Sequence, residues 1–165
     1  MVRFEVTLLS VGTGEIGICP VPGRAGDYGG DLEVIRRWRP DLVLTMTTEA
    51  ELACVGAASF GADLTAQGTG WHHLPIEDFG APGGETLALW PAASQQARRR
   101  LARGGRVLVH CHGGCGRSGM AALRLLIEAG EAPETALRRL RNARPCAVET
   151  TKQLAWAMAG RPEPA

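Results

Sequence analysis

The sequence predicts a single α/β domain in which a small, mainly parallel central sheet is flanked by helices. Two observations lead to this prediction. Short apolar segments rich in β-branched residues alternate with segments of helical periodicity, and a chain of 165 residues suits one domain with a core of its own. We find no internal repeat and no dividing linker, so we expect one domain over residues 1–160 and a frayed tail over residues 161–165.

Short apolar runs mark the strands that we expect in the sheet. They lie at residues 4–9, 42–45, 71–74 and 107–110. His72 and His73 fall on the third run, where the alternation of a strand places one side chain toward the core and the other toward solvent. Glycine-rich segments at residues 23–30 and 79–84 are expected to be loops.

Three helices are predicted in the second half of the chain. The clearest follows Arg117, because residues 120–129 are apolar on nearly every side, as expected for a helix packed against the centre of a sheet. Another begins near Pro133, a favourable residue for a first helical turn. The last covers residues 150–159. We expect arginines 98–106, near the C-terminus of an earlier helix, to form a solvated face.

Composition excludes several classes of function. With 18 basic and 17 acidic residues, the chain has no global charge that would attract nucleic acid or an acidic membrane. Its N-terminus lacks a signal pattern and no apolar run approaches the roughly 18 residues that span a bilayer, so we expect a cytoplasmic protein. The five cysteines form an odd set, for which reduced thiols are the expected state.

Three glycines match the spacing of a dinucleotide-binding fingerprint. Gly12, Gly14 and Gly17 follow the first predicted strand. The fingerprint needs a helix that begins there, whereas Pro20 and Pro22 prevent a continuous helix. We therefore interpret these glycines as a turn between two strands.

The informative segment is residues 107–119, which passes from a buried strand through a glycine-rich loop into an apolar helix. Backbone N–H groups of such a loop can turn inward, and the helix N-terminus adds further donors and positive potential, so the loop can bind phosphate. The loop residues expected to bind substrate are His112, Gly113, Gly114, Cys115, Gly116 and Arg117.

Cys111 stands at the mouth of this loop, where the same dipoles favour a thiolate over a thiol. Arg117 lies six residues further on, and its planar guanidinium can hold two phosphate oxygens at once. Ser118 can donate a hydrogen bond to the cysteine sulfur and His110 can brace the loop. The segment therefore predicts a nucleophilic cysteine with an anion-binding loop around it.

The order His110-Cys111, five residues, Arg117-Ser118 resembles the signature of the cysteine-based protein phosphatases. Residues 71–82 look like the general-acid loop of the dual-specificity branch, and within it the chain is most similar to cyclin-dependent-kinase-associated phosphatases and their bacterial relatives. Residues 147–153 resemble the closing helix of these proteins, so the likeness covers about residues 40–160.

The resemblance implies catalytic roles for four residues, namely Cys111, Arg117, Ser118 and Asp78. Asp78 would be the general acid, although Glu77 and Glu85 lie close enough in the sequence to compete for that role. One departure is Glu149, which stands where these relatives often carry glutamine; this second anion either weakens phosphate binding or lies outside the pocket.

The implied reaction is hydrolysis of a phosphate monoester through a phosphocysteine on Cys111, with no metal and no cofactor. The substrate would be a phosphorylated protein or a small phosphate ester. Classical tyrosine-specific members of this superfamily deepen the pocket with an aromatic residue on a separate loop. Tyr28 is the one tyrosine of this chain and its context does not suit that role, so we expect a shallower cleft. Two alternatives stay open, a sulfurtransferase and a phosphate-binding module without turnover.

The remaining cysteines and histidines allow further interpretations. Cys115 is either a small loop residue or a redox partner that traps oxidised Cys111 as a disulfide, whereas Cys19, Cys54 and Cys146 are expected to be packing residues. A zinc site that combines Cys111, His112 and Cys115 with His72 or His73 is disfavoured, because a second ligand pair is missing and Arg117 would place positive charge beside the ion.

Overall fold

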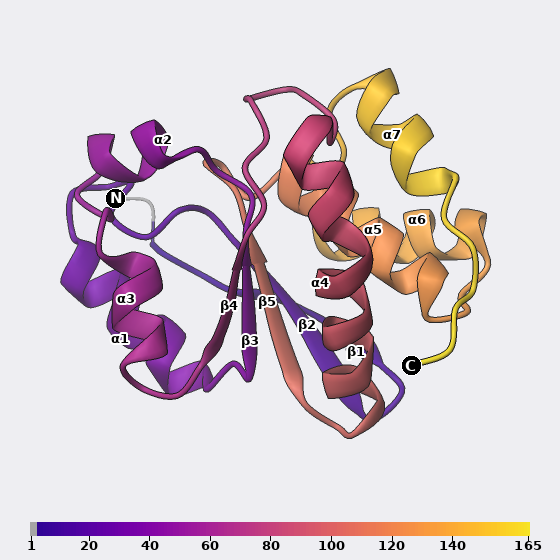
Figure 1. Cartoon of the computed structure of the whole chain (residues 1–165), viewed down its shortest axis with the longest axis horizontal. Helices are drawn as coiled ribbons and strands as arrows, with labels where there is room; N and C mark the ends of the chain where they lie inside the picture. Colours follow the sequence, from indigo (N-terminus) through magenta and orange to yellow (C-terminus); the bar gives the residue numbers. More distant parts are fainter. Residues whose placement is uncertain (1–2) are drawn as a thin grey trace.

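The computed structural model describes residues 3–165 and contains a five-stranded mixed sheet covered by helices on both faces (Figure 1). The strand order is β1-β2-β5-β3-β4, in which β1 pairs antiparallel with β2 and all other neighbours are parallel. The strands are β1 (Thr7–Val11), β2 (Gly14–Cys19), β3 (Leu42–Thr45), β4 (Gly70–His73) and β5 (Arg106–His110). The predicted α/β class and mainly parallel sheet are therefore confirmed.

Seven helices lie within the described residues. They are α1 (Tyr28–Trp38), α2 (Glu49–Cys54), α3 (Phe60–Thr65), α4 (Gly84–Ala102), α5 (Gly116–Glu128), α6 (Pro133–Ala143) and α7 (Thr151–Met158). The three helices predicted in the second half are confirmed as α5, α6 and α7. None of the helices within residues 3–165 is long and apolar enough to cross a membrane.

The sheet separates two apolar cores. On one face, α1, α2 and α3 pack around Phe60, Ile35 and Val43, and on the other, α4 to α7 pack around a larger core that includes Leu44 and Val109. Helix α5 lies within this larger core, and nearly all its side chains are buried. This position explains why its sequence is apolar on nearly every side.

The N-terminal region differs from the prediction. The first strand begins at Thr7 rather than Phe4. A turn at residues 12–13 leads into a second strand over residues 14–19, so the predicted turn between two strands is confirmed, but Gly14 and Gly17 belong to the strand rather than to the turn. Gly17 lies inside this strand, and it must be glycine because a side chain there would collide with Trp38 and Val6. Helix α1 begins at Tyr28, inside the segment expected to be a loop; Asp27 caps it by accepting a hydrogen bond from the N–H of Gly30.

The C-terminal tail is docked rather than frayed. The N–H of Glu163 donates to the carbonyl of Glu128 at 2.8 Å, and its carboxylate lies 3.1 Å from the guanidinium of Arg98. Arg98 also donates to the carbonyl oxygen of Pro164. The side chain of Arg98 is only 3% exposed, so this arginine does not belong to a solvated face. Pairing with the tail compensates the cost of burying its charge.

Candidate functional site

The glycine-rich loop lies at the carboxyl end of β5, the central strand of the sheet, and leads directly into α5. Gly114 has a φ of +70°, and a Cβ there would lie 2.8 Å from the backbone of Cys19 and Pro20. A larger residue would therefore need both a disfavoured conformation and a displaced neighbouring strand end. This close approach holds the loop against the end of β2.

The carbonyl groups of the loop point outward. The carbonyl of His112 accepts a hydrogen bond from the N–H of Val21 at 3.1 Å. The guanidinium of Arg144 donates to the carbonyls of Gly114 at 2.7 Å and Gly113 at 3.1 Å. Because a trans peptide places a carbonyl and the following N–H on opposite sides, these contacts turn the N–H groups of residues 113–115 toward the inside of the loop. These N–H groups donate to no acceptor within residues 3–165, so they are free to bind an anion.

Cys111 and Ser118 lie together at this loop. Cys111 is 3% exposed, and its sulfur lies 3.2 Å from the hydroxyl oxygen of Ser118, in the first turn of α5. Behind them, Nε2 of His110 lies 2.8 Å from the hydroxyl of Thr45. Burial lowers the pKa of His110 to about 4, an effect that nearby Arg117 reinforces. His110 is therefore a neutral, buried contact between β5 and β3 near neutral pH.

The guanidinium of Arg117 is almost fully buried, and its contacts fix its orientation. Nη1 donates to Glu51 Oε2 at 2.8 Å and to the carbonyl of Ile76 at 2.7 Å, while Nη2 donates to Glu51 Oε1 at 2.7 Å. Nε is buried and has no partner within residues 3–165. Both Nη1 hydrogens are thus occupied. Nε–H is free, and among the described residues the second Nη2 hydrogen faces only the carboxylate of Asp78, whose Oδ1 lies 3.2 Å from Nη2. These two adjacent donors match two oxygens of one phosphate.

Glu51, which the sequence pattern does not single out, holds Arg117 in place. It lies in α2, where it forms a capping box with Thr48, and its carboxylate also binds Arg117 across 66 positions of the chain. Burial opposes its ionisation, but hydrogen bonds from Arg117 and Thr48 lower the pKa of Glu51 to about 2. The sequence carries the capping signal Thr-x-x-Glu; it contains nothing that connects this helix to Arg117.

Asp78 reaches the site, and its side chain remains 53% exposed. Its Oδ1 accepts a hydrogen bond from the N–H of Phe79 at 3.0 Å and lies 3.2 Å from Nη2 of Arg117. Glu77 lines the same cavity of about 400 Å³ as Asp78, Glu51 and His112. Within residues 3–165, Glu77 makes no ion pair with Arg117, and Glu85 belongs to the first turn of α4. Among these competing carboxylates, the structure brings Asp78 to the arginine.

The segment between α6 and α7 closes the other side of the site. Gln153 is buried and donates from Nε2 to the carbonyl of Gly80, in the loop that follows Asp78. A Cβ on Gly116 would lie 2.4 Å from a carboxylate oxygen of Glu149. The carboxylate of Glu149 is thus packed against the start of α5, on the rim of the glycine-rich loop.

The thiol chemistry differs from the expectation of five reduced cysteines. Cys115 and Cys146 form a disulfide, whereas Cys19, Cys54 and Cys111 are free. Cys115 is therefore neither an unpaired loop residue nor a partner of Cys111, and Cys146 is not a packing residue. The pairing depends on the close approach of the glycine-rich loop to the segment after α6, a contact between residues 31 positions apart.

The two neighbouring histidines of β4 have structural partners and do not reach the loop. Nε2 of His73 lies 2.7 Å from the carbonyl of Thr47, and the ring of His72 pairs with the amide oxygen of Gln96. Both side chains are half-buried, so the expected division into one core and one solvent-facing residue is wrong. As an edge strand, β4 leaves both faces partly open.

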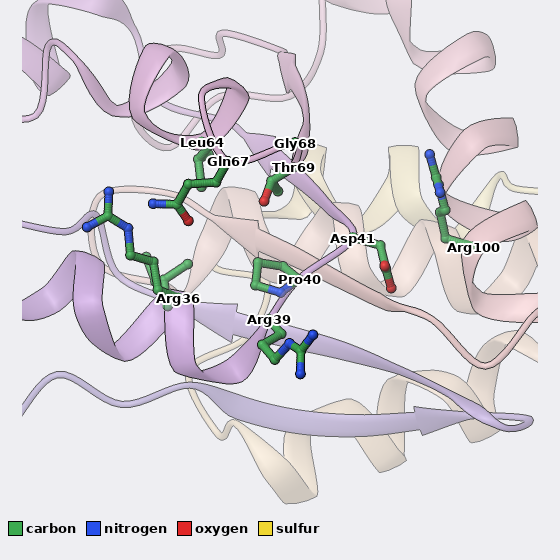
Figure 2. Close-up of a pocket in the computed structure, with 10 residues that line it drawn as sticks. Arg36, Arg39, Pro40, Asp41, Leu64, Gln67, Gly68, Thr69 and Arg100 are labelled. Carbon is green, nitrogen blue, oxygen red and sulfur yellow. The ribbon is translucent and has the colours of Figure 1, made fainter.

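A separate cavity lies at the opposite end of the sheet (Figure 2). Its volume is about 340 Å³, and its lining includes Arg36, Arg39, Asp41 and Arg100. Asp41 directly precedes β3, whereas Cys111 directly follows the parallel strand β5, so the two places are at opposite strand ends. This cavity is lined by no cysteine and no histidine, and it offers no nucleophile of the kind found at the loop.

Comparison with known proteins identifies similar sequences and structures. The family described as "Polymorphic toxin system, DSP-PTPase phosphatase" matches residues 41–131. Cyclin-dependent kinase inhibitor 3 of Mus musculus is 31% identical over 146 residues, which cover 84% of this chain and 67% of that protein. The protein of the same name from Rattus norvegicus is 30% identical over 147 residues, with 84% and 68% covered.

Two solved structures are similar over most of the chain. A kinase associated phosphatase, KAP, whose catalytic-site cysteine is replaced by serine, has a TM-score of 0.79 and 26% identity, with 95% of this chain and 93% of that chain covered. Tk-PTP in its active form has a TM-score of 0.66 and 27% identity, with 86% and 87% covered.

Proposed function

Since this chain belongs to the dual-specificity type of protein tyrosine phosphatases and is a cysteine-dependent phosphatase, we propose that Cys111 is its nucleophile and Asp78 its general acid and base. The observation that carries this proposal is the hydrogen-bonding of Arg117. Glu51 and Ile76 hold its guanidinium beside the loop that begins with Cys111. Nε–H stays free there, and among the described residues the adjacent Nη2–H meets only the exposed carboxylate of Asp78, which a bound phosphate can displace. A tetrahedral phosphate fits these donors and the inward N–H groups together.

In the first step, the thiolate of Cys111 attacks phosphorus and the bond to the ester oxygen breaks. Asp78 gives its proton to that departing oxygen. Negative charge on the transferring phosphoryl group is met by Arg117 and by the N–H groups of residues 113–116, whose positions are fixed before the reaction begins. Preorganised donors of this kind supply the largest part of the rate gain.

In the second step, water attacks the phosphocysteine and Asp78 accepts the proton from that water. The sulfur of Cys111 leaves as a thiolate. The hydroxyl of Ser118, 3.2 Å from this sulfur, donates a hydrogen bond to the developing charge and makes it a better leaving group. These two steps need no metal ion and no cofactor.

We further propose that the substrate is a phosphorylated protein rather than a small, enclosed ester. Asp78 remains 53% exposed, and the cavity that it lines opens to solvent beside α2. A cleft of this kind accepts a phosphorylated side chain presented on a larger surface. A panel of phosphorylated peptides, inositol phosphates and sugar phosphates tests this step, and a clear preference for a small ester would contradict it.

Trapping the intermediate tests the proposed nucleophile. After acid quenching during turnover of an aryl phosphate, we expect mass spectrometry to find one phosphoryl group on the peptide that contains Cys111. Cys111→Ser should lose turnover, because a hydroxyl in the same place stays protonated and is a poor nucleophile. Sulfur transfer from thiosulfate to cyanide at a rate comparable with ester hydrolysis would favour a sulfurtransferase. Phosphate binding without turnover would favour the non-catalytic alternative.

A further inference from the structure

The Cys115–Cys146 disulfide is a second thiol system beside the nucleophile. Cys115 belongs to the phosphate-binding loop and is half-buried, whereas Cys146 lies after α6 and is exposed. Cys111 is free in the same structure. The disulfide can therefore open and close by exchange at the exposed residue, Cys146, while Cys111 keeps its thiol.

The disulfide belongs to a set of contacts that hold the back of the loop. Arg144, two residues before Cys146, donates to the carbonyls of Gly113 and Gly114. The N–H of Val148, two residues after Cys146, donates to the carbonyl of Cys115 at 3.3 Å. The covalent bond thus lies between two hydrogen-bonded contacts of one short segment, 144–148. This segment turns the loop N–H groups inward, and the disulfide fixes its distance from the loop.

We propose that Cys115–Cys146 is a thiol–disulfide exchange site whose oxidation state sets the affinity of the loop for phosphate. The proposal rests on the function proposed above, in which this loop binds the phosphoryl group. With the disulfide closed, the loop and segment 144–148 are held together before the ligand arrives. With the disulfide open, part of the binding energy is used to order them, so phosphate binds more weakly.

The exchange needs a dithiol reductant, either a small dithiol or a protein dithiol. One thiolate of the reductant attacks the sulfur of Cys146, the exposed residue of the pair, which forms a mixed disulfide and releases Cys115 as a thiolate. The second thiolate then attacks the reductant sulfur of that mixed disulfide, which releases Cys146 and leaves the reductant as a cyclic or intramolecular disulfide. Two electrons pass from the reductant to the protein. Cys115 is a suitable leaving group because it occupies the N-cap position of α5, beside a helix N-terminus that stabilises a negative charge.

The test compares oxidised wild type, wild type reduced with dithiothreitol, and the double variant Cys115→Ser/Cys146→Ser. Alkylation and peptide mapping establish that Cys111 is a free thiol in both wild-type forms. Affinity is measured with inorganic phosphate by calorimetry and by inhibition of p-nitrophenyl phosphate hydrolysis. We expect oxidised wild type to bind phosphate about fivefold more tightly than the reduced form. The double variant should resemble the reduced form and should not respond to dithiothreitol.

Three results would overturn the proposal: equal phosphate affinity of the two wild-type forms, failure of the disulfide to form in a thiol–disulfide buffer, or a double variant that still responds to reductant. The wild-type comparison needs no substitution, so it remains decisive even where the double variant folds poorly. Failure of the proposed function gives a different result, because no form with a free Cys111 would then hydrolyse p-nitrophenyl phosphate. Hydrolysis at equal phosphate affinity would refute only the redox proposal.

Discussion

Replacing Glu51 by glutamine tests whether a residue of α2 orients Arg117, the arginine proposed to bind phosphate. Glutamine at this position keeps the capping box with Thr48 but removes the charge that holds Arg117. A pKa lowered from 4.5 to about 2 corresponds to about 3 kcal/mol of interaction with the ionised carboxylate. Thr48 supplies part of this energy, and water screens a side chain that is 21% exposed. We therefore expect a loss of about 1–2 kcal/mol in the free energy of unfolding.

The assay combines urea unfolding at pH 7 with steady-state kinetics, and Glu49→Gln on the same helix is the matched control. Glu49 is exposed and makes no ion pair within residues 3–165. Because Arg117 keeps its charge but loses its anchor, kcat/KM for Glu51→Gln should fall by about 10-fold to 100-fold, mainly through kcat. If the two variants behaved alike in both measurements, Glu51 would not position the arginine.

Three further predictions concern the site. Arg117→Lys should keep the positive charge but lose the paired donors, so kcat should fall by about 100-fold or more; wild-type kinetics would place the phosphate elsewhere. Asp78→Asn should impair hydrolysis of phenyl phosphate far more than of an ester with a strongly acidic leaving group, because an acid helps most where the leaving oxygen is basic. The same pattern in Glu77→Gln, with Asp78→Asn unaffected, would move the role to Glu77. Finally, burial lowers the pKa of His110 from 6.5 to about 4 in the folded protein. As the pH falls below 6.5, His110 is protonated in the unfolded chain before it is protonated in the folded protein. The protein should therefore lose about 3 kcal/mol of stability between pH 6.5 and pH 4, and His110→Gln should remove that part of the pH dependence. Parallel stability curves for the variant and the wild type would contradict this origin.

The parts of the fold that could be predicted are those with local signals. The predicted helix near Pro133 agrees with α6, because a proline marks its first turn and its apolar residues share one stripe. The strand before Cys111 and the helix after it could be predicted for the same kind of reason: a short β-branched run, a glycine-rich loop and an apolar helix follow one another.

The parts that could not be predicted depend on tertiary contacts. Strand β2 contains Gly14 and Gly17, which normally weaken a strand, and Gly17 is accommodated because the ring of Trp38 packs over it. Helix α1 contains glycines in its first turn, where propensity is low. The tail is docked because buried Arg98 needs Glu163 as a partner.

The same distinction applies to the site. Cys111, Arg117 and Ser118 lie within eight positions of one another, so one motif could identify them, and Ser118 does contact the sulfur of Cys111. Glu51 and Cys146 act through neighbours that lie 66 and 31 positions away. Their partners become visible only when the fold brings α2 and segment 144–148 to the phosphate-binding loop.

The most direct measurement of the central claim is rapid-quench detection of the phosphoenzyme. Wild-type protein mixed with excess aryl phosphate should release a burst of leaving group equal to the amount of active enzyme, together with the same amount of phosphate covalently bound to the peptide that contains Cys111. Cys111→Ser should give neither signal while it still binds inorganic phosphate. Turnover without any phosphoenzyme, or phosphate found on another residue, would contradict nucleophilic catalysis by Cys111.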